Sequence, residues 1–268
     1  MQLLQLLTEQ AARQQEVVEL VSQIRQSKQF FDARGSDSSL WFWRGIKYNE
    51  VPLTMSQAST PRTDRRPADT SPKLHEMLDS RLLRDFGIKY RSAATFVTGD
   101  HTTAKDFGSL CIILPLSNYE LVYGENCLDA YGVFRGHDLK AYIIERSQST
   151  QLSLDGLPSE VSTRAGEADL MLWVQSRPTA MKLAEQWFDD RYASCQYKKG
   201  NTTEAIRSGR EIMLHTPEIA IIPYRKNIHP DIISVVERVL NTRLNLDMDG
   251  GTPSTDQLIN VMLPHIFK

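Results

Sequence analysis

The chain has 268 residues, of which 41% are hydrophobic and 24% are charged, and its formal net charge is −2. This composition is ordinary for a globular protein with a core, and the charge excludes a basic surface over the whole molecule, so nucleic-acid binding needs a local patch. Three scattered cysteines exclude a disulfide framework and a zinc knuckle. No stretch approaches the roughly 18 apolar residues that span a membrane, and the first ten residues lack the features of a signal peptide. We therefore expect a soluble, cytoplasmic protein with no membrane partner.

Residues 1–30 predict a helical N-terminal arm. Apolar residues recur at spacings of three, four and seven between Leu3 and Ile24, as on one face of an amphipathic helix. A helix that packs against the rest of the chain is the main interpretation, and a helix that binds a partner or mediates dimerisation is the alternative. Residues 31–268 form the second predicted domain.

The segment Leu40-Trp-Phe-Trp-Arg-Gly45 predicts a strand, because aromatic residues favour β-structure. An arginine in so apolar a strand needs an anion, since a buried and unpaired guanidinium is costly. The anion is either a carboxylate of the protein or a phosphate of a ligand. Arg44 is therefore the first candidate binding residue.

Residues 49–73 predict a long irregular segment rich in proline, serine and threonine, and loops of that length in compact domains are usually functional or mobile. The segment carries Arg62, Arg65 and Arg66. These arginines form either a solvated basic loop or a site for the phosphates of a ligand or of a nucleic acid.

The rest of the chain predicts alternating helices and strands. The predicted strands are residues 91–99, 110–115, 211–215 and 218–224, the last two on either side of a turn. The predicted helices are residues 72–85, 100–107, 180–192 and 230–242. With no internal repeat, the pattern indicates one mixed domain of the α+β class behind the helical arm.

Two side chains at the ends of predicted strands carry chemistry. Thr98 ends one strand, where its hydroxyl either anchors a ligand or bonds its own backbone. Glu211 opens an apolar strand, where it is either a solvated edge residue or a catalytic carboxylate. The six histidines show no metal-binding spacing, so no metal is expected.

Three motifs, taken in chain order, resemble one enzyme family. Phe42-Trp-Arg-Gly45 is similar to an aromatic-Arg-Gly strand that comes first in the family. Phe96-Val-Thr98, followed by Ala104 and Phe107, stands where the family has a Ser-Thr-Ser strand and a helix. Glu211-Ile-Met-Leu214 stands where the family has its catalytic strand, Glu-Val-Leu-Leu. The family is the R-S-E class of mono-ADP-ribosyltransferases, found in bacterial toxins, phage enzymes and vertebrate ecto-enzymes.

The resemblance spans about residues 40–225 and implies a split β-sheet of the ADP-ribosyltransferase type. It also implies an enzyme, a glycosyltransferase that uses NAD as a substrate and needs no metal, of the kind found in toxins and phage–host conflict enzymes. The N-terminal helix is then a candidate site for a partner such as an antitoxin, and Arg62, Arg65 and Arg66 are candidates for binding the phosphates of NAD or of a nucleic-acid acceptor. Glu211 is then the catalytic carboxylate, which stabilises an oxocarbenium-like centre. Arg44 clamps the NAD pyrophosphate beside Gly45.

Two further roles follow from the resemblance. Thr98, or alternatively Ser92, supplies the hydroxyl that holds the catalytic glutamate and contributes to the NAD site. Phe107 packs near the nicotinamide or, as an alternative, in the core. A second Phe-Arg-Gly at residues 134–136 follows the Thr98 strand, so its order is wrong for the family and we interpret it as a turn.

The resemblance leaves the identity of the acceptor open. Protein-modifying members of the family have a glutamate or glutamine two residues before the catalytic glutamate, and this chain has Gly209 there. The acceptor is a macromolecule, and RNA or DNA is slightly favoured over protein because the basic segment with Arg62 can meet phosphates. The alternatives are an NAD glycohydrolase and a non-catalytic interaction protein on the same scaffold.

Overall fold

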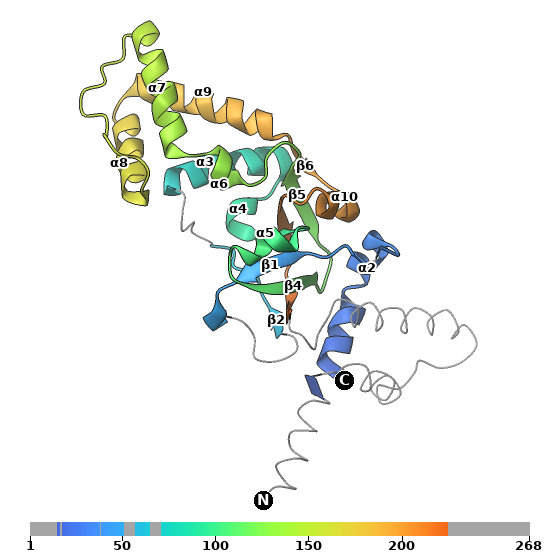
Figure 1. The fold of residues 1–268 in the computed structure, drawn as a ribbon. Helices are drawn as coiled ribbons and strands as arrows, with labels where there is room; N and C mark the ends of the chain where they lie inside the picture. Colours follow the sequence, from blue (N-terminus) through green and yellow to red (C-terminus); the bar gives the residue numbers. More distant parts are fainter. Residues whose placement is uncertain (1–14, 17, 38, 51–56, 65–70, 225–268) are drawn as a thin grey trace, which may run out of the picture.

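The computed structural model describes residues 15–16, 18–37, 39–50, 57–64 and 71–224, and these form one antiparallel sheet with helices around it (Figure 1). The described strands pair in the order β2-β8-β4-β1-β3-β7-β5-β6. The strands are β1 (Trp43–Ile46), β2 (Gln57–Ser59), β3 (Thr95–Thr98), β4 (Ser109–Pro115), β5 (Glu120–Gly124), β6 (Tyr197–Lys199), β7 (Glu211–His215) and β8 (Ile219–Pro223). The helices are α2 (Lys28–Arg34), the short 3₁₀ helix η1 (Tyr48–Glu50), α3 (Pro72–Phe86), α4 (Tyr90–Ala93), α5 (His101–Lys105), α6 (Ala130–Val133), α7 (Gly136–Thr150), α8 (Arg164–Gln175), α9 (Pro178–Cys195) and α10 (Thr202–Arg207).

The predicted α+β class is confirmed, and local capping explains two of the predicted helices. The Ser71 side chain accepts the Leu74 backbone N–H, and Pro72 occupies the first turn, so α3 begins where the sequence indicates. Asp100 caps α5 by accepting the backbone N–H groups of Thr102 and Thr103. The predicted helix 230–242 lies outside the described residues.

One predicted strand differs from the structure in its bounds, and the two strands predicted around Thr216 are present but do not pair with each other. The strand expected over residues 91–99 begins only at Thr95, because the buried carboxylate of Asp79 accepts the backbone N–H groups of Arg91 and Ser92 and so holds the short helix α4. The strands on either side of the turn at Thr216, β7 and β8, are not neighbours, since β4, β1 and β3 lie between them. Strands β2, β5 and β6 were not predicted.

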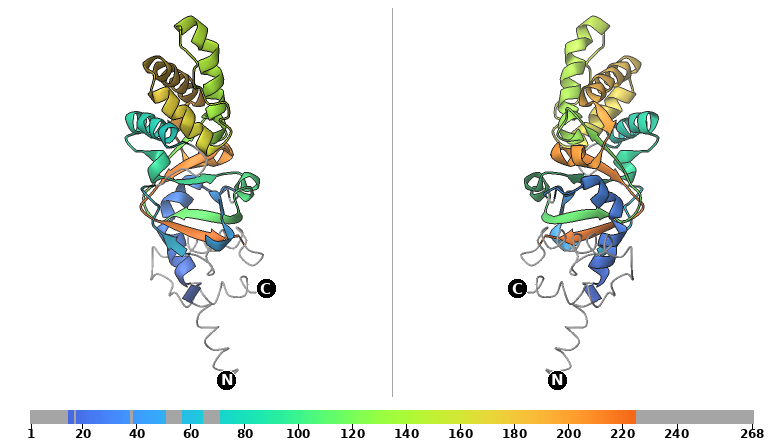
Figure 2. Two further views of the ribbon diagram at one scale, coloured as in Figure 1. Left: turned by 90° about the vertical axis from the view of Figure 1, so that its left-hand side faces the viewer. Right: turned by 90° about the vertical axis from the view of Figure 1, so that its right-hand side faces the viewer.

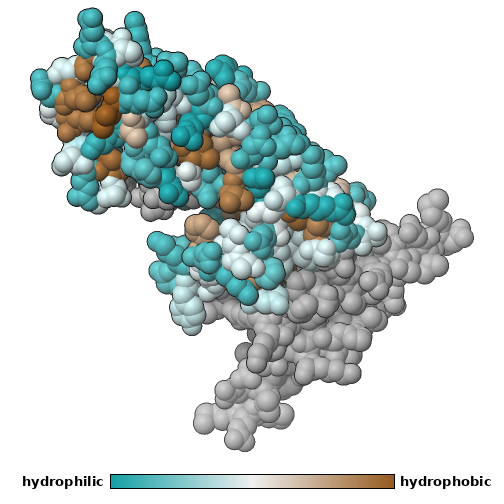
Figure 3. Space-filling view, turned by 45° about the horizontal axis from the view of Figure 1, so that its top comes forward, coloured by the Kyte–Doolittle hydropathy of each residue, from teal (hydrophilic) through white to brown (hydrophobic). Residues whose placement is uncertain are grey.

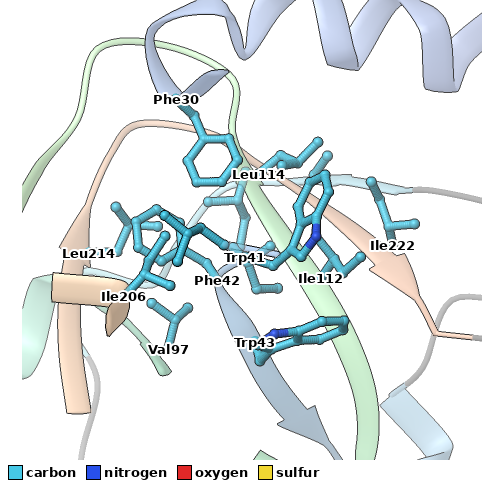
Figure 4. Packing of buried hydrophobic residues seen from close by; sticks show 14 of the residues in the cluster. Phe30, Trp41, Phe42, Trp43, Val97, Ile112, Leu114, Ile206, Leu214 and Ile222 are labelled. Carbon is cyan, nitrogen blue, oxygen red and sulfur yellow. The ribbon is translucent and has the colours of Figure 1, made fainter. Parts of the chain in front are cut away.

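The aromatic run before and in β1 belongs to the first core cluster, which also contains part of the N-terminal arm (Figure 4). Phe42 packs on Phe30 of α2 with ring centroids 5.1 Å apart. Residues 18–26 are helical, and their apolar side chains are buried in the same cluster. Each fully buried phenylalanine stabilises the fold by about 1.5–3 kcal/mol. The described part of the arm therefore packs against the sheet.

The second core cluster lies on the other face of β5 and β7, under α3 and the helices from α6 to α9. Side chains alternate between the faces of these strands: Val122 and Met213 belong to the second cluster, whereas Tyr123 and Ile212 belong to the first. Helices α7, α8 and α9 form a bundle that extends beyond the β5–β6 end of the sheet (Figures 1 and 2). We call these three helices the helical bundle.

On the face that Figure 3 shows, the described residues are largely hydrophilic and the apolar side chains lie in separate patches. Among the described helices, none combines the length and hydropathy that crossing a bilayer requires. Cys111, Cys127 and Cys195 are buried free thiols.

Candidate functional site

The sheet is interrupted where β1 meets β3. These two strands share a single paired position, Trp43 with Thr98, whereas β1 pairs with β4 and β3 with β7 over four positions each. Across this weak junction, Nη1 of Arg44 donates to the carbonyl oxygen of Phe96 at 3.4 Å. A cleft of about 270 Å³ opens here.

Five separate stretches of the chain line the cleft: β1, β3, the end of α5 with Phe107 just after it, the loop that leads into α6, and the turn that leads into β7 with the first residue of that strand. The lining residues are Trp43, Arg44, Gly45, Phe96, Val97, Thr98, Thr103, Ala104, Phe107, Leu128, Asp129, Gly209 and Glu211. The three motifs of the family resemblance therefore meet in one place. Three of the lining residues, Trp43, Val97 and Ala104, also belong to the first core cluster, so the cleft is built on rigid elements.

Two other clefts, of about 410 Å³ and 340 Å³, lie near β5, β6 and α10 and contain none of the predicted site residues. The charges at the larger cleft are already paired: Lys198 donates to Glu125 at 3.1 Å and to Glu204 at 2.6 Å. Size alone would favour these clefts, but the β1–β3 cleft holds the side chains that are able to act on a ligand.

Gly45 brings β1 against the end of α5. A Cβ atom built on Gly45 would overlap the carbonyl oxygen of Ala104 and lie 2.8 Å from the backbone nitrogen of Gly108. No side chain fits between these two backbones, so glycine is required at the mouth of the cleft.

The guanidinium of Arg44 is partly buried, and its burial lowers its pKa from the ordinary value. The acidic groups that act in the opposite direction are Glu50 and Cys111. Among the residues that the structure describes, Arg44 forms no ion pair. Because an arginine stays charged in proteins, this cation is available to an anionic ligand.

The carboxylate of Glu211 is held on one side only. Its Oε1 atom accepts two hydrogen bonds, one from Nη1 of Arg91 at 2.9 Å and one from the backbone N–H of Ala130 at 3.4 Å. Its Oε2 atom has no partner within the described part of the chain. The side chain is 23% exposed and lines the cleft. Glu211 is therefore not a solvated residue at the edge of the sheet. One of its carboxylate oxygens remains available to accept a hydrogen bond from a ligand.

Thr98 lies directly opposite Glu211 in the β3–β7 ladder, but its hydroxyl does not bond the carboxylate. Its Oγ1 atom donates to the carbonyl oxygen of Gly209 at 2.9 Å and accepts the backbone N–H of Asp100 at 3.1 Å. Gly209 has a positive φ of 66°, which favours glycine. Thr98 thus fixes the turn that leads into β7.

Ser92, the alternative hydroxyl, lies outside the cleft lining. Its Oγ atom donates to Asp79 and is 3.0 Å from Nε2 of His75. The side chain beside it, Arg91, is the one that contacts Glu211. The sequence prediction missed this contact, because it placed residues 91–99 on a strand.

Phe107 is exposed at the rim of the cleft, not buried in the core: its exposed fraction is 69%, and that of Leu128, which also lines the cleft, is 71%. Arg62 is exposed, pairs with Asp64 at 3.3 Å and does not line the cleft. Arg65 and Arg66 lie outside the described residues. The second Phe-Arg-Gly, residues 134–136, lies where α7 begins and does not line the cleft.

Comparisons with protein-family models, with curated proteins and with solved structures find no match for this chain. Within the described ranges, histidine, cysteine and acidic side chains form no group able to hold a metal ion. The chemistry available at the cleft is that of an anion-binding cation, a carboxylate with a free oxygen and an apolar rim.

Proposed function

We propose that this chain is an NAD-dependent mono-ADP-ribosyltransferase with a split sheet of the ADP-ribosyltransferase type. One observation carries the proposal: Arg44, Thr98 and Glu211, which come from three separate motifs, line a single cleft. The interrupted β1–β3 junction is where a split sheet would open, and Arg44 reaches across it.

Arg44 binds the pyrophosphate of NAD. Its planar guanidinium offers parallel N–H donors that match phosphate oxygens, and it has no ion pair among the described residues that a phosphate would have to displace. At about 270 Å³ the cleft is slightly below the usual range for small-molecule pockets, so it accepts part of the dinucleotide. The rest lies outside the cleft.

Glu211 acts where the glycosidic bond breaks. The bond between the ribose C1′ and the nicotinamide nitrogen is cleaved, and nicotinamide leaves with the bonding electron pair. The acceptor atom then bonds to C1′ and loses its proton to solvent. A carboxylate with one free oxygen accepts a hydrogen bond from a ribose hydroxyl and stabilises the positive charge that develops on the sugar.

The apolar rim suits the leaving group. Phe107 and Leu128 expose large apolar surfaces beside the cleft, and a flat heteroaromatic ring packs well against an aromatic side chain. We therefore propose that the nicotinamide ring packs against Phe107 and Leu128 at the rim of the cleft.

The acceptor is proposed to be a macromolecule, with RNA or DNA slightly favoured over protein. NAD glycohydrolase is the second candidate, and the observation that favours it is Gly209. This residue lines the cleft two positions before Glu211 and has no side chain to orient an acceptor. With water as the acceptor, the same cleft would release free ADP-ribose.

The test is to incubate the purified protein with NAD labelled in its adenylate half, with and without a host lysate. We expect nicotinamide release, together with label in a macromolecule that disappears after nuclease treatment. Label removed by protease instead identifies a protein acceptor, and free ADP-ribose alone identifies the glycohydrolase. Glu211→Gln is the negative variant, and Glu218→Gln, a change at an exposed glutamate, is its control. No nicotinamide release from the wild type would reject the proposal.

A further inference from the structure

Every described hydrogen bond to the Glu211 carboxylate falls on the same oxygen. Arg91 and the backbone of Ala130 both donate to Oε1, at 2.9 Å and 3.4 Å. A carboxylate held in this way cannot rotate freely about its last bond. The second oxygen, Oε2, is therefore presented in a fixed direction.

Arg91 is itself held at three points. Its backbone N–H donates to the buried Asp79 carboxylate at 2.8 Å, which fixes α4. Its guanidinium lies over the ring of Phe96, 4.4 Å from the centroid, and Phe96 lines the cleft. Nη1 makes the ion pair with Glu211. The Arg91 side chain is only 11% exposed, so this pair is screened less than a surface pair.

We infer that Arg91 is a positioning residue for Glu211, an inference that rests on the proposed function. Arg91 anchors Oε1 so that Oε2 faces the substrate in the cleft. The family resemblance assigns this task to a hydroxyl at Thr98 or Ser92, but those hydroxyls bond Gly209 and Asp79 instead. A charge-assisted hydrogen bond from arginine is stronger than one from a neutral hydroxyl, so it is the better anchor.

The competing interpretation is an ion pair that only ties α4 to β7. In a Glu211→Gln background the ion pair is already broken, so both interpretations predict little further loss from Arg91→Gln. They differ in Arg91→Gln alone: a positioning residue lowers kcat per folded molecule, whereas a purely structural pair lowers the free energy of unfolding and leaves kcat per folded molecule unchanged.

The experiment is a double-mutant cycle with Arg91→Gln and Glu211→Gln, in which nicotinamide release is measured under single-turnover conditions. Arg91→Gln alone is expected to lower kcat by about 10- to 100-fold, the usual cost of misplacing a catalytic group, with a smaller change in KM for NAD. Arg91→Lys, which keeps the charge, should recover part of this loss. In the Glu211→Gln background, Arg91→Gln should change kcat by less than about twofold, because the two residues act as a unit.

Arg81→Gln is the matched control. Arg81, on α3, also pairs with a carboxylate, that of Asp189, at 2.8 Å, and it lies over an aromatic ring, that of Phe188, at 5.5 Å. None of these three residues lines the cleft. The change should leave kcat unaltered.

An equal loss of kcat from Arg91→Gln in both backgrounds would overturn the inference, as would a wild-type kcat in the single variant. Neither result affects the proposed function, which depends on the wild type and on Glu211→Gln. If the wild type releases no nicotinamide, the proposed function itself fails and the inference fails with it.

Discussion

Glu167 at the start of α8 and Glu211 in the cleft are both largely withdrawn from solvent, but their carboxylates are used differently. Both oxygens of Glu167 are bonded: Oε2 accepts the backbone N–H of Ser71 at 3.2 Å, and Oε1 accepts that of Gly136 at 3.0 Å. These groups belong to the starts of α3 and α7, so one carboxylate satisfies donors at two helix ends. Glu211 has one oxygen bonded and one without a partner among the described residues.

This difference separates a structural carboxylate from a candidate catalytic one. A buried polar atom without a partner costs free energy, so both oxygens of the buried Glu167 are bonded. The Glu211 side chain is 23% exposed, and its second oxygen is not among the buried atoms that lack a partner, so this oxygen is left to solvent or to a ligand. It lines the same cleft as Arg44, whose charge is not paired by any described residue. Polar groups left available together in one cleft point to a ligand, whereas each taken alone would be weak support.

The largest expected effect comes from Glu211→Gln, which keeps the shape of the side chain and removes its charge. The rate of nicotinamide release should fall by about 10²–10³-fold, because one electrostatic group that faces the developing cation is lost. The affinity for NAD should change little, since the proposed function assigns ground-state binding to Arg44. If Glu211→Gln releases nicotinamide near the wild-type rate, Glu211 is not a catalytic carboxylate and does not differ in role from the structural Glu167.

The next effect concerns Arg44. Arg44→Ala should weaken NAD binding by about 10- to 100-fold, which corresponds to the loss of hydrogen bonds to a charged group. Arg44→Lys should restore only part of the affinity, because a point charge replaces a planar fork. Calorimetry measures both, and Arg135→Ala in the second Phe-Arg-Gly is the matched control. If Arg135→Ala weakens binding and Arg44→Ala does not, the wrong arginine has been assigned to the pyrophosphate.

The sequence was sufficient for the parts of the site that depend on local pattern. The apolar run around Arg44 predicted a buried strand with an arginine that needs an anion, and the cap at Asp100 predicted α5. The order of the motifs selected Glu211 among the acidic residues, and Arg44, Thr98 and Glu211 do line one cleft. The strand around Arg44 and helix α5 follow from hydrophobic pattern and capping, which neighbouring residues encode, whereas the choice of Glu211 and its grouping with Arg44 and Thr98 came from the family resemblance.

Arg91 could not be found in this way. Helix α4 has only four residues, too few for a helical period, and a side chain distant in sequence, Asp79, holds it. The contact between Arg91 and Glu211 joins residues 120 positions apart. Strand β5 was missed for a similar reason, because its partners β6 and β7 lie far along the chain. Tertiary contacts decide these features, and a single sequence does not display them.

A smaller effect is expected from the basic segment, where Arg62 contrasts with Arg44. Arg62 is exposed and pairs with Asp64, so its net contribution to binding any one phosphate is modest. If Arg62, Arg65 and Arg66 bind a nucleic-acid acceptor, replacing all three with alanine should flatten the salt dependence of acceptor labelling, by a slope of about 0.7–0.9 for each phosphate that is no longer neutralised. NAD hydrolysis without acceptor should stay close to the wild-type rate. If the salt dependence of acceptor labelling does not change, these three arginines do not bind the acceptor.

Glu167→Gln should have the smallest effect on activity and a measurable effect on stability. An amide has one acceptor oxygen, so only one of the backbone N–H groups of Ser71 and Gly136 keeps a partner. The unsatisfied donor and the removal of a charge at two helix starts should lower the free energy of unfolding by about 1–3 kcal/mol. Urea denaturation measures this decrease, and Glu160→Gln, at an exposed glutamate that bonds only Ser162, is the control. Nicotinamide release per folded molecule should not change, because Glu167 does not line the cleft. A variant with full stability but reduced turnover would reverse the roles assigned to the two carboxylates.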